Sequence, residues 1–324
     1  MTLAGAAPAA EATGSRRPNR IVVGGGAVVF VILALVITGL RGQPQFPFVA
    51  NDGGLAQKPS PAEAPYLTGN HVAATIVMTL IGLIGVTVGI RMALRGRTFL
   101  PVMVALSAAF IVIPEVFYDV IGAVYFPFSE TEPFGVSFSI LGRTMPVWII
   151  AGWFGYGVFA LLTYVMLTAR PSTRILWYAW GAALAGDVVF EELLLKLDVY
   201  HYYGNQPLVL ISELPWWWMP CNSVGVMLAA AIAYRFRERM RGAGSLAMLV
   251  ITPMSVTGIY GFIALPSWIA TNADYPWLVT QLLGFATLAL GVDAFIGVLK
   301  LVLNRDPFDL DYKPSEAEEF LRVR

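Results

Sequence analysis

The stretch VAATIVMTLIGLIGVTVGIRM, residues 72–92, contains no charged side chain before Arg91. A helix of about 20 such residues spans the hydrocarbon core of a bilayer, which is about 30 Å thick. Comparable apolar windows recur at 21–40, 99–121, 145–168, 175–195, 216–234, 246–265 and 277–301. The pattern predicts an all-α, polytopic integral membrane protein with about eight transmembrane helices in one bundle.

The composition favours the same class. Of the 324 residues, 57% are hydrophobic and 13% are charged, and the mean hydropathy is +0.68, whereas soluble domains average about 45–50% apolar and about 25% charged residues. The formal net charge is zero, so we expect no nucleic acid as a partner. With one cysteine and two histidines, the chain cannot build a Cys/His zinc site, and we expect neither a metal nor a cofactor.

The basic residues predict the orientation. If the N-terminus is cytoplasmic and eight spans alternate, 17 of the 21 basic residues lie on the inner side, as the positive-inside rule requires. The outer loops hold the other four, Arg41, Lys58, Arg143 and Lys196. We therefore expect a multi-pass plasma membrane protein with a disordered cytoplasmic tail at 1–20, a transmembrane domain at 21–303 and a second cytoplasmic tail at 304–324. The outer connections are expected to be loops, among them 126–144 and 266–276.

Carboxyl side chains interrupt two of the predicted spans. PEVFYDVIGAVYFP places Glu115 and Asp119 one helical turn apart, and GDVVFEELLLK places Asp187 and Glu191 in the same way. An ionised carboxylate inside a bilayer costs at least about 2.5–3.5 kcal/mol, so these groups need partners, protons or water. Counted along their helices, all four lie in the outer half of the membrane, where we expect them to face a shared cavity.

Aromatic and amide side chains accompany the carboxyl groups. In LPWWWMPCNSVG, residues 214–225, three consecutive indoles cover about 300° of a helix, so at least one should turn inward. An interfacial aromatic belt explains most of the others. Asn222 is expected to bond a carboxyl group of the other two spans, although Arg143 is an alternative, purely structural partner for Glu115 or Asp119. The expected substrate-binding residues are Trp216, Trp217, Asn222, Tyr118, Tyr202, Trp148 and Tyr260.

Motifs of several enzyme classes are missing from the sequence. It contains no G-x-x-x-x-G-K-[ST], G-x-S-x-G or H-E-x-x-H, and no [ND]-D-x-x-D diphosphate motif. A carboxyl group withdrawn from water keeps its proton near neutral pH and acts as a general acid. Tryptophan and tyrosine faces stabilise a carbocation by about 0.5–2 kcal/mol per ring. We therefore expect a metal-independent enzyme that protonates an isoprenoid alkene or epoxide, with Glu115, Asp119, Asp187 and Glu191 as catalytic groups.

The stretch from Glu191 through VYHYYGNQPL to LPWWW is similar to the carotenoid-biosynthesis hydratase family, polytopic membrane enzymes that add water to the terminal alkene of a C40 or C50 isoprenoid. This resemblance covers residues 191–218 and implies Glu191, Tyr202 and Trp216 as site residues. The placement of the acids resembles that of small integral-membrane terpene cyclases. PEVFYDVIGAVYFP and GRTMPVW resemble segments of actinobacterial membrane proteins.

Two other functions are compatible with the sequence. A proton-coupled transporter or lipid flippase would use intramembrane carboxylates as a proton relay. Such a protein should carry polar groups through both halves of the membrane, and here Asp293 is the acid predicted for the inner half. In a non-catalytic membrane subunit, the acids would pair with one another or with Arg143 and would line no cavity.

Overall fold

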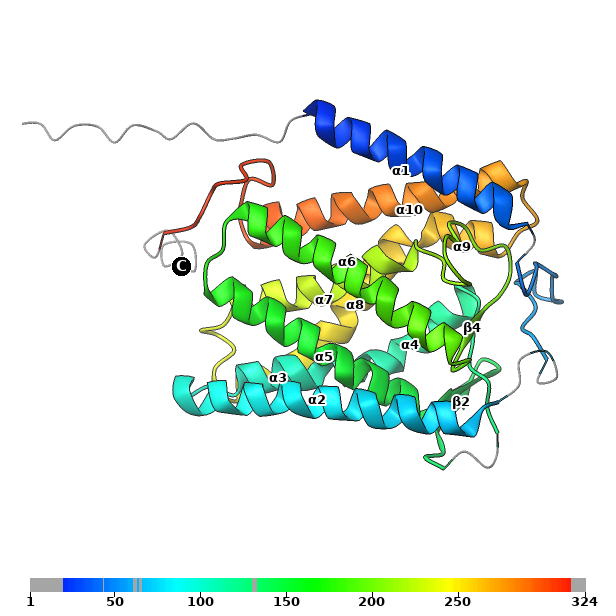
Figure 1. Ribbon diagram of the computed structural model, residues 1–324. Coiled ribbons are helices and arrows are strands. Elements are labelled where there is room, and N and C mark those ends of the chain that lie inside the picture. The colour runs from blue at the N-terminus through cyan, green and yellow to red at the C-terminus, as the bar shows by residue number, and fades with distance from the viewer. Residues whose placement is uncertain (1–19, 43, 61–62, 64–65, 130–132, 316–324) are drawn as a thin grey trace, which may run out of the picture.

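The fold is known from a computed structural model, in which the helices lie side by side in an elongated bundle (Figure 1). The structure describes residues 20–42, 44–60, 63, 66–129 and 133–315. The tail predicted at 1–20 lies outside this range except for Arg20, which begins the first helix. The end of the predicted C-terminal tail, residues 316–324, also lies outside it.

The described part of the chain is mostly helical. The α-helices are α1 (Arg20–Arg41), α2 (Thr68–Gly96), α3 (Leu100–Ser107), α4 (Val112–Ile121), α5 (Val147–Thr168), α6 (Thr173–Lys196), α7 (Trp218–Arg235), α8 (Met248–Ile263), α9 (Leu265–Thr271) and α10 (Trp277–Gly297). Shorter helical turns are η1 (Ala108–Ile111), η2 (Gly242–Ala247) and the π-helix η3 (Val298–Val302). The strands are β1 (Val124–Tyr125), β2 (Val136–Ile140), β3 (Arg143–Pro146) and β4 (His201–Tyr202).

Six described stretches are long and apolar enough to cross a membrane. They are Val23–Arg41, Thr68–Gly96, Leu100–Ile121, Val147–Thr168, Gly242–Ile263 and Trp277–Val302, and each coincides with a predicted window. The other two windows form α6 and α7, which run alongside the six (Figure 1). These two helices are less apolar because α6 carries Asp187 and Glu191, and α7 carries Pro220 and Asn222.

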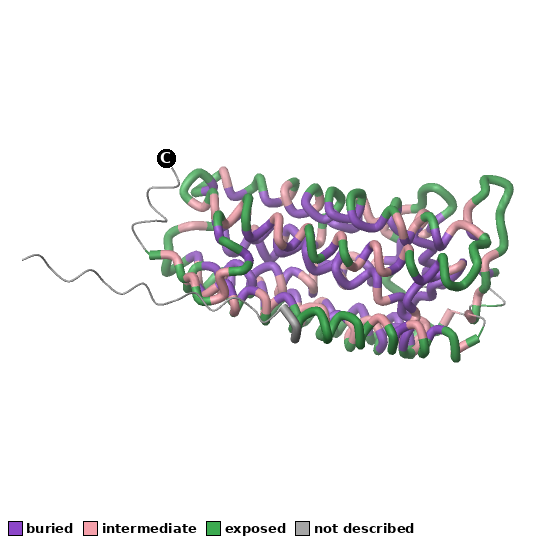
Figure 2. Tube along the Cα trace, turned by 90° about the horizontal axis from the view of Figure 1, so that it is seen from above, coloured by how far each residue is buried: buried purple, intermediate pink, exposed green. Residues whose placement is uncertain are grey.

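The central helix of the bundle is α7, which packs against α5, α6, α8 and α10. Apart from Leu228 and Ile232, its residues from 218 to 234 are all buried. Figure 2 shows the same arrangement, with buried residues inside the bundle and exposed residues on its outer sides. Close packing depends on small residues here: a Cβ added at Gly225 would lie 2.7 Å from the Cα of Val256 in α8. Such close backbone approach stabilises helix pairs in membranes.

The span predicted at 99–121 is continuous but changes its winding before the carboxyl pair. Pro114 has no backbone N–H, so it cannot bond the carbonyl of Phe110 one turn earlier. The 3₁₀ turn η1 occupies this position, between α3 and α4. The irregular turn thus directly precedes α4, which carries Glu115 and Asp119.

Short strand pairs, which the sequence did not predict, join the loops at one end of the bundle. After α4, β1 pairs antiparallel with β4, which follows α6. The hairpin of β2 and β3 begins inside the predicted loop 126–144 and ends at Pro146. The loop prediction for 266–276 is also wrong in part, because α9 continues to Thr271. The pairing of β1 with β4 holds the ends of α4 and α6 together, and these two helices carry the predicted carboxyl pairs.

The described residues after η3 pack against the beginning of α6. The Arg174 guanidinium lies 2.7 Å from the Asp311 carboxylate, and Trp177 Nε1 donates to the Pro307 carbonyl at 2.9 Å. Arg305 Nη1 donates to the Pro171 carbonyl at 2.5 Å. The start of α1 and this segment lie at the same end of the bundle (Figure 1).

Candidate functional site

A cavity of about 90 Å³ lies between α4, α5, α6, α7 and α8, beside the β1–β4 pair. Three carboxyl groups line it: Glu115 and Asp119 from α4, and Glu191 from α6. Most of the remaining wall is aromatic and consists of Tyr118, Phe126, Trp148, Trp153, Tyr156, Phe190, Tyr200, Tyr202, Trp218 and Tyr260. Acidic side chains from two separate helices therefore meet in one aromatic chamber.

Glu191 is held by two tyrosines. The hydroxyl of Tyr200 donates to Glu191 Oε2, and the hydroxyl of Tyr202 approaches the same oxygen at 3.3 Å. Both tyrosines follow α6, and the β4 pairing with β1 turns the chain back so that they reach the carboxyl group. An Oε2 that accepts from two donors leaves Oε1 as the oxygen that can carry or take up a proton.

Glu115 and Asp119 have different surroundings. Trp153 Nε1 of α5 donates to Glu115 Oε2 at 2.5 Å. Asp119 is only 2% exposed, and its Oδ2 has no hydrogen-bond partner within the described chain. Few buried polar groups in folded proteins lack a partner, so this unpaired oxygen of a cavity-lining residue marks Asp119 as a candidate functional group.

Asp187 lies behind the cavity, not in its wall. Asn222, which does line the cavity, donates from Nδ2 to Asp187 Oδ2 at 3.1 Å, as predicted for this amide. The Tyr260 hydroxyl donates to Asn222 Oδ1. The Tyr260 ring stacks on the ring of Tyr118 with centroids 4.3 Å apart. These contacts form a polar chain from α8 through α7 to α6.

The three consecutive tryptophans have three different surroundings. Trp218 turns into the cavity, so the expectation that at least one indole faces inward is confirmed. Trp217 is fully buried elsewhere and donates from Nε1 to Gln206 Oε1 at 3.1 Å. Trp216 stacks on Phe30 of α1, with centroids 6.4 Å apart. Trp216 and Trp217, expected as substrate-binding residues, therefore do not line the carboxyl cavity.

Arg143 forms no salt bridge with the carboxyl pair of α4 within the described structure. Its Nη2 donates to the hydroxyl of Tyr203, and its Cζ lies 5.6 Å from the centroid of that ring. No salt bridge joins Arg143 to Glu115 or Asp119, all of which the structure describes. The purely structural pairing considered from the sequence is therefore not formed.

Sequence reasoning missed several lining residues, notably Trp153, Tyr156 and Tyr200. A signal for the first two was present, because Trp148, Gly152 and Tyr156 recur at four-residue spacing and Trp153 follows Gly152. The remaining predicted residues Tyr118, Tyr202, Trp148 and Tyr260 do line the cavity. Over the described ranges, no group of three His, Cys, Asp or Glu side chains is arranged to hold a metal ion.

The cavity opens between helices. Five of its lining residues keep some exposure, and all belong to α4, α5 or α6: Glu115, Gly152, Tyr156, Phe190 and Glu191. Both α5 and α6 pack against α7 and make little contact with each other. An apolar cavity of about 150 Å³ takes up benzene, so this smaller chamber admits only one end of a long molecule.

The N–H groups of Trp148 and Trp218 are buried without a hydrogen-bond partner in the described structure, although both indoles line the cavity. Together with the carboxyl groups, these N–H groups place a few hydrogen-bond donors and acceptors in an otherwise apolar wall, which is typical of ligand sites.

No family model, curated protein or solved structure matches the chain.

Proposed function

We propose that the protein is a membrane enzyme that acts on a hydrophobic isoprenoid of terpene, carotenoid or sterol-like type by carboxyl general-acid catalysis. The reaction is cyclisation, isomerisation or hydration. The observation that carries the proposal is the shared chamber, in which Glu115, Asp119 and Glu191 stand among aromatic rings. With α6 and α7 counted as spans, the chain crosses the plasma membrane eight times and has both termini in the cytoplasm.

In the first step, a protonated carboxyl group transfers its proton to an alkene carbon or an epoxide oxygen of the substrate. We assign this role to Asp119, because the residue lines the chamber and its Oδ2 has no partner in the described chain. The alkene π electrons form the new C–H bond, or the epoxide C–O bond breaks, and a carbocation remains. Nearby aromatic faces, such as those of Trp148 and Trp218, stabilise this cation.

In the second step, the cation is discharged. Attack by another alkene of the same chain closes a ring, and loss of a proton to Glu191 completes a cyclisation or an isomerisation. If a water molecule attacks instead, Glu191 takes the proton that this water loses, and the product is an alcohol. The tyrosines on Oε2 leave Oε1 of Glu191 to act as the base.

The chamber is large enough to hold one end of a substrate molecule. Its volume of about 90 Å³ holds a terminal group, while the opening between α5 and α6 leaves the rest of the substrate in the bilayer. A long isoprenoid with a reactive terminal alkene or epoxide has this shape.

A proton-coupled transporter is the second candidate. The hydrogen-bonded series from Tyr260 through Asn222 to Asp187 favours it, since such series conduct protons. The inner half of the predicted membrane domain favours the enzyme over the transporter. A transporter needs polar groups there, but Asp293 is exposed on α10 and does not extend the hydrogen-bonded series inward.

The proposal is tested by expressing the protein in a host that makes linear and epoxidised isoprenoids and comparing lipid extracts by liquid chromatography and mass spectrometry. Unchanged mass with altered retention means cyclisation or isomerisation, and the gain of one water means hydration. Asp119→Asn should abolish the new product at equal protein level. If cells with the wild-type protein yield no new lipid species from either substrate class, the enzymatic proposal fails.

A further inference from the structure

An apolar groove of about 920 Å³ lies on the other side of α6 from the carboxyl chamber. Phe30 of α1, Val188 of α6 and Leu288 of α10 form its walls, and Pro220 of α7 lies on its floor. The chamber uses other residues of α6, among them Phe190, Glu191 and Leu194. One helix therefore separates two sites of very different size.

The groove is closed at one end. The ring of Phe30 contacts the rings of Trp216 and Phe285, at centroid distances of 6.4 and 6.3 Å. Next to these rings, Ala34 of α1 packs with Leu208 and Leu210 in a small buried cluster. Because α1 meets the rest of the protein here, the groove cannot continue past this end as an ordinary lipid-facing surface would.

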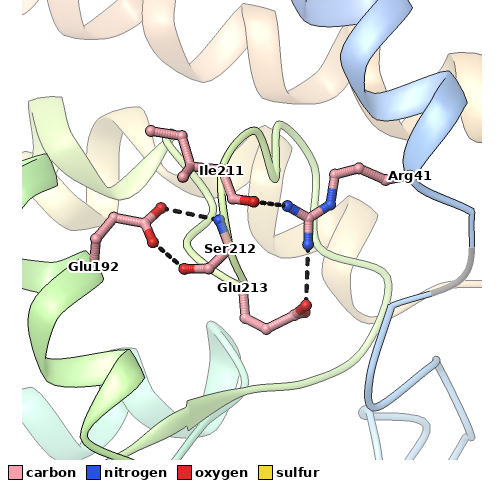
Figure 3. A network of polar contacts seen from close by, with 5 residues as sticks. All are labelled: Arg41, Glu192, Ile211, Ser212 and Glu213. Atoms are coloured by element: carbon pink, nitrogen blue, oxygen red, sulfur yellow. Dashed lines mark hydrogen bonds and ion pairs between the residues drawn. The ribbon is translucent and has the colours of Figure 1, made fainter.

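Hydrogen bonds fix the loop that covers this end (Figure 3). Arg41 of α1 donates to the Ile211 carbonyl and forms a 3.0 Å salt bridge with Glu213. From the opposite side, Glu192 of α6 accepts from the hydroxyl and the backbone N–H of Ser212. Ile211 itself lines the groove. Three consecutive residues are thus bound to both helices that form the walls.

The other end of the groove is open. Toward its first residues, α1 diverges from α10 (Figure 1). A Cβ added at Gly24, Gly25 or Gly26 would meet no atom within 4 Å. Since Val23–Arg41 and Trp277–Val302 are both stretches suited to crossing a membrane, the medium at this opening is the hydrocarbon of the bilayer.

We propose that the groove is a binding site for one long hydrocarbon chain, from an isoprenoid or an acyl lipid. Its volume lies in the upper part of the range for ligand pockets, about 300–1,000 Å³. Water does not fill an apolar cavity, whereas a chain from the adjoining bilayer enters without leaving hydrocarbon. The N–H of Trp180 is already bonded to Ser223 Oγ at 3.0 Å, and the N–H of Trp216 is buried without a partner in the described structure. The other lining side chains are apolar, so recognition rests on shape and apolar contact. This site does not depend on the proposed catalytic function.

The test uses two glycines of α6. Gly181 lines the groove, whereas Gly186 does not, and a Cβ added at either position meets no atom within 4 Å. Gly181→Trp should therefore place an indole ring in the groove and obstruct it without disturbing helix packing, and Gly186→Trp is the matched control. Ala289→Phe narrows the groove from α10 and serves as a second variant if Gly181→Trp does not fold.

The probe is a C20 isoprenoid alcohol that carries a diazirine, added to the full-length protein in phosphatidylcholine nanodiscs, with labelled peptides mapped by mass spectrometry. We expect saturable labelling of groove peptides in the wild type and in Gly186→Trp, and at least a fivefold loss in Gly181→Trp or Ala289→Phe. Competition by unlabelled geranylgeraniol alone indicates an isoprenoid site, and equal competition by a C18 fatty alcohol indicates a general chain site. Labelling that does not saturate, or that persists in both groove variants, means bulk lipid contact only and overturns the proposal.

Discussion

Asn222 of α7 donates a hydrogen bond to Asp187 of α6, with Nδ2 and Oδ2 3.1 Å apart. The same side-chain amide accepts a hydrogen bond from the Tyr260 hydroxyl of α8. A buried amide bonded through both its nitrogen and its oxygen has one favoured orientation. It therefore ties three helices together at the wall of the carboxyl chamber.

We predict that Asn222→Leu lowers the free energy of unfolding by about 1–3 kcal/mol, because it leaves buried groups of Asp187 and Tyr260 without partners. Thermal unfolding in detergent measures the change. Tyr260→Phe should cost less, since the bond between Asn222 and Asp187 survives. A fully stable Asn222→Leu protein would show that this contact does not hold the helices together.

Helix packing is tested at Gly157 of α5. A Cβ added there would lie 2.0 Å from the Ala105 carbonyl oxygen of α3, so Gly157→Ala forces the two helices apart. We expect a loss of about 1–3 kcal/mol, as for other overpacked positions. The matched control is Gly258→Ala in α8, where an added Cβ meets nothing within 4 Å. Equal melting temperatures for the two variants would contradict the packing of α3 on α5.

Acid should weaken the strand pair beside the chamber. Burial lowers the pKa of His201 below its usual value of 6.5, and the carboxylate of Asp198 offsets this only in part. At this side chain the unfolded state then binds more protons than the folded state, so the contribution of His201 to the free energy of unfolding becomes less favourable as the pH drops below about 6.5. Melting curves between pH 5 and pH 8 should therefore show the wild type losing stability toward acid relative to His201→Gln. Identical slopes would mean that His201 is not buried in its neutral form.

Much of the bundle follows from local properties of the sequence. The length of the apolar windows predicts the six clear spans, and four-residue spacing places Glu115 with Asp119 on one face of a helix. The bond from Asn222 to a carboxyl group also follows from the sequence, because an amide buried in hydrocarbon needs a partner. These inferences use only spacing along one helix or the cost of burial.

The rest depends on contacts between distant segments. The pairing of Tyr125 with His201 joins two loops that lie far apart in the chain, and no local pattern in either loop specifies it. The tryptophans illustrate a second limit. Because α7 begins at Trp218, Trp216 and Trp217 precede the helix, and the helical spacing used to place them does not apply. Asp187 and Glu191 share a helical face, yet only Glu191 lines the chamber.

The central claim is that the carboxyl groups of the chamber carry the reaction, and neighbouring glutamates of α6 provide its most direct test. Glu191 lines the chamber, whereas Glu192 bonds Ser212 outside it. In the expression host, measured as product formed per amount of membrane-inserted protein, Glu191→Gln should lower conversion by about 10²–10⁴-fold, as expected for loss of an acid–base group. Glu192→Gln should retain activity near that of the wild type. Full conversion by Glu191→Gln, or an equal loss in both variants, would contradict the account.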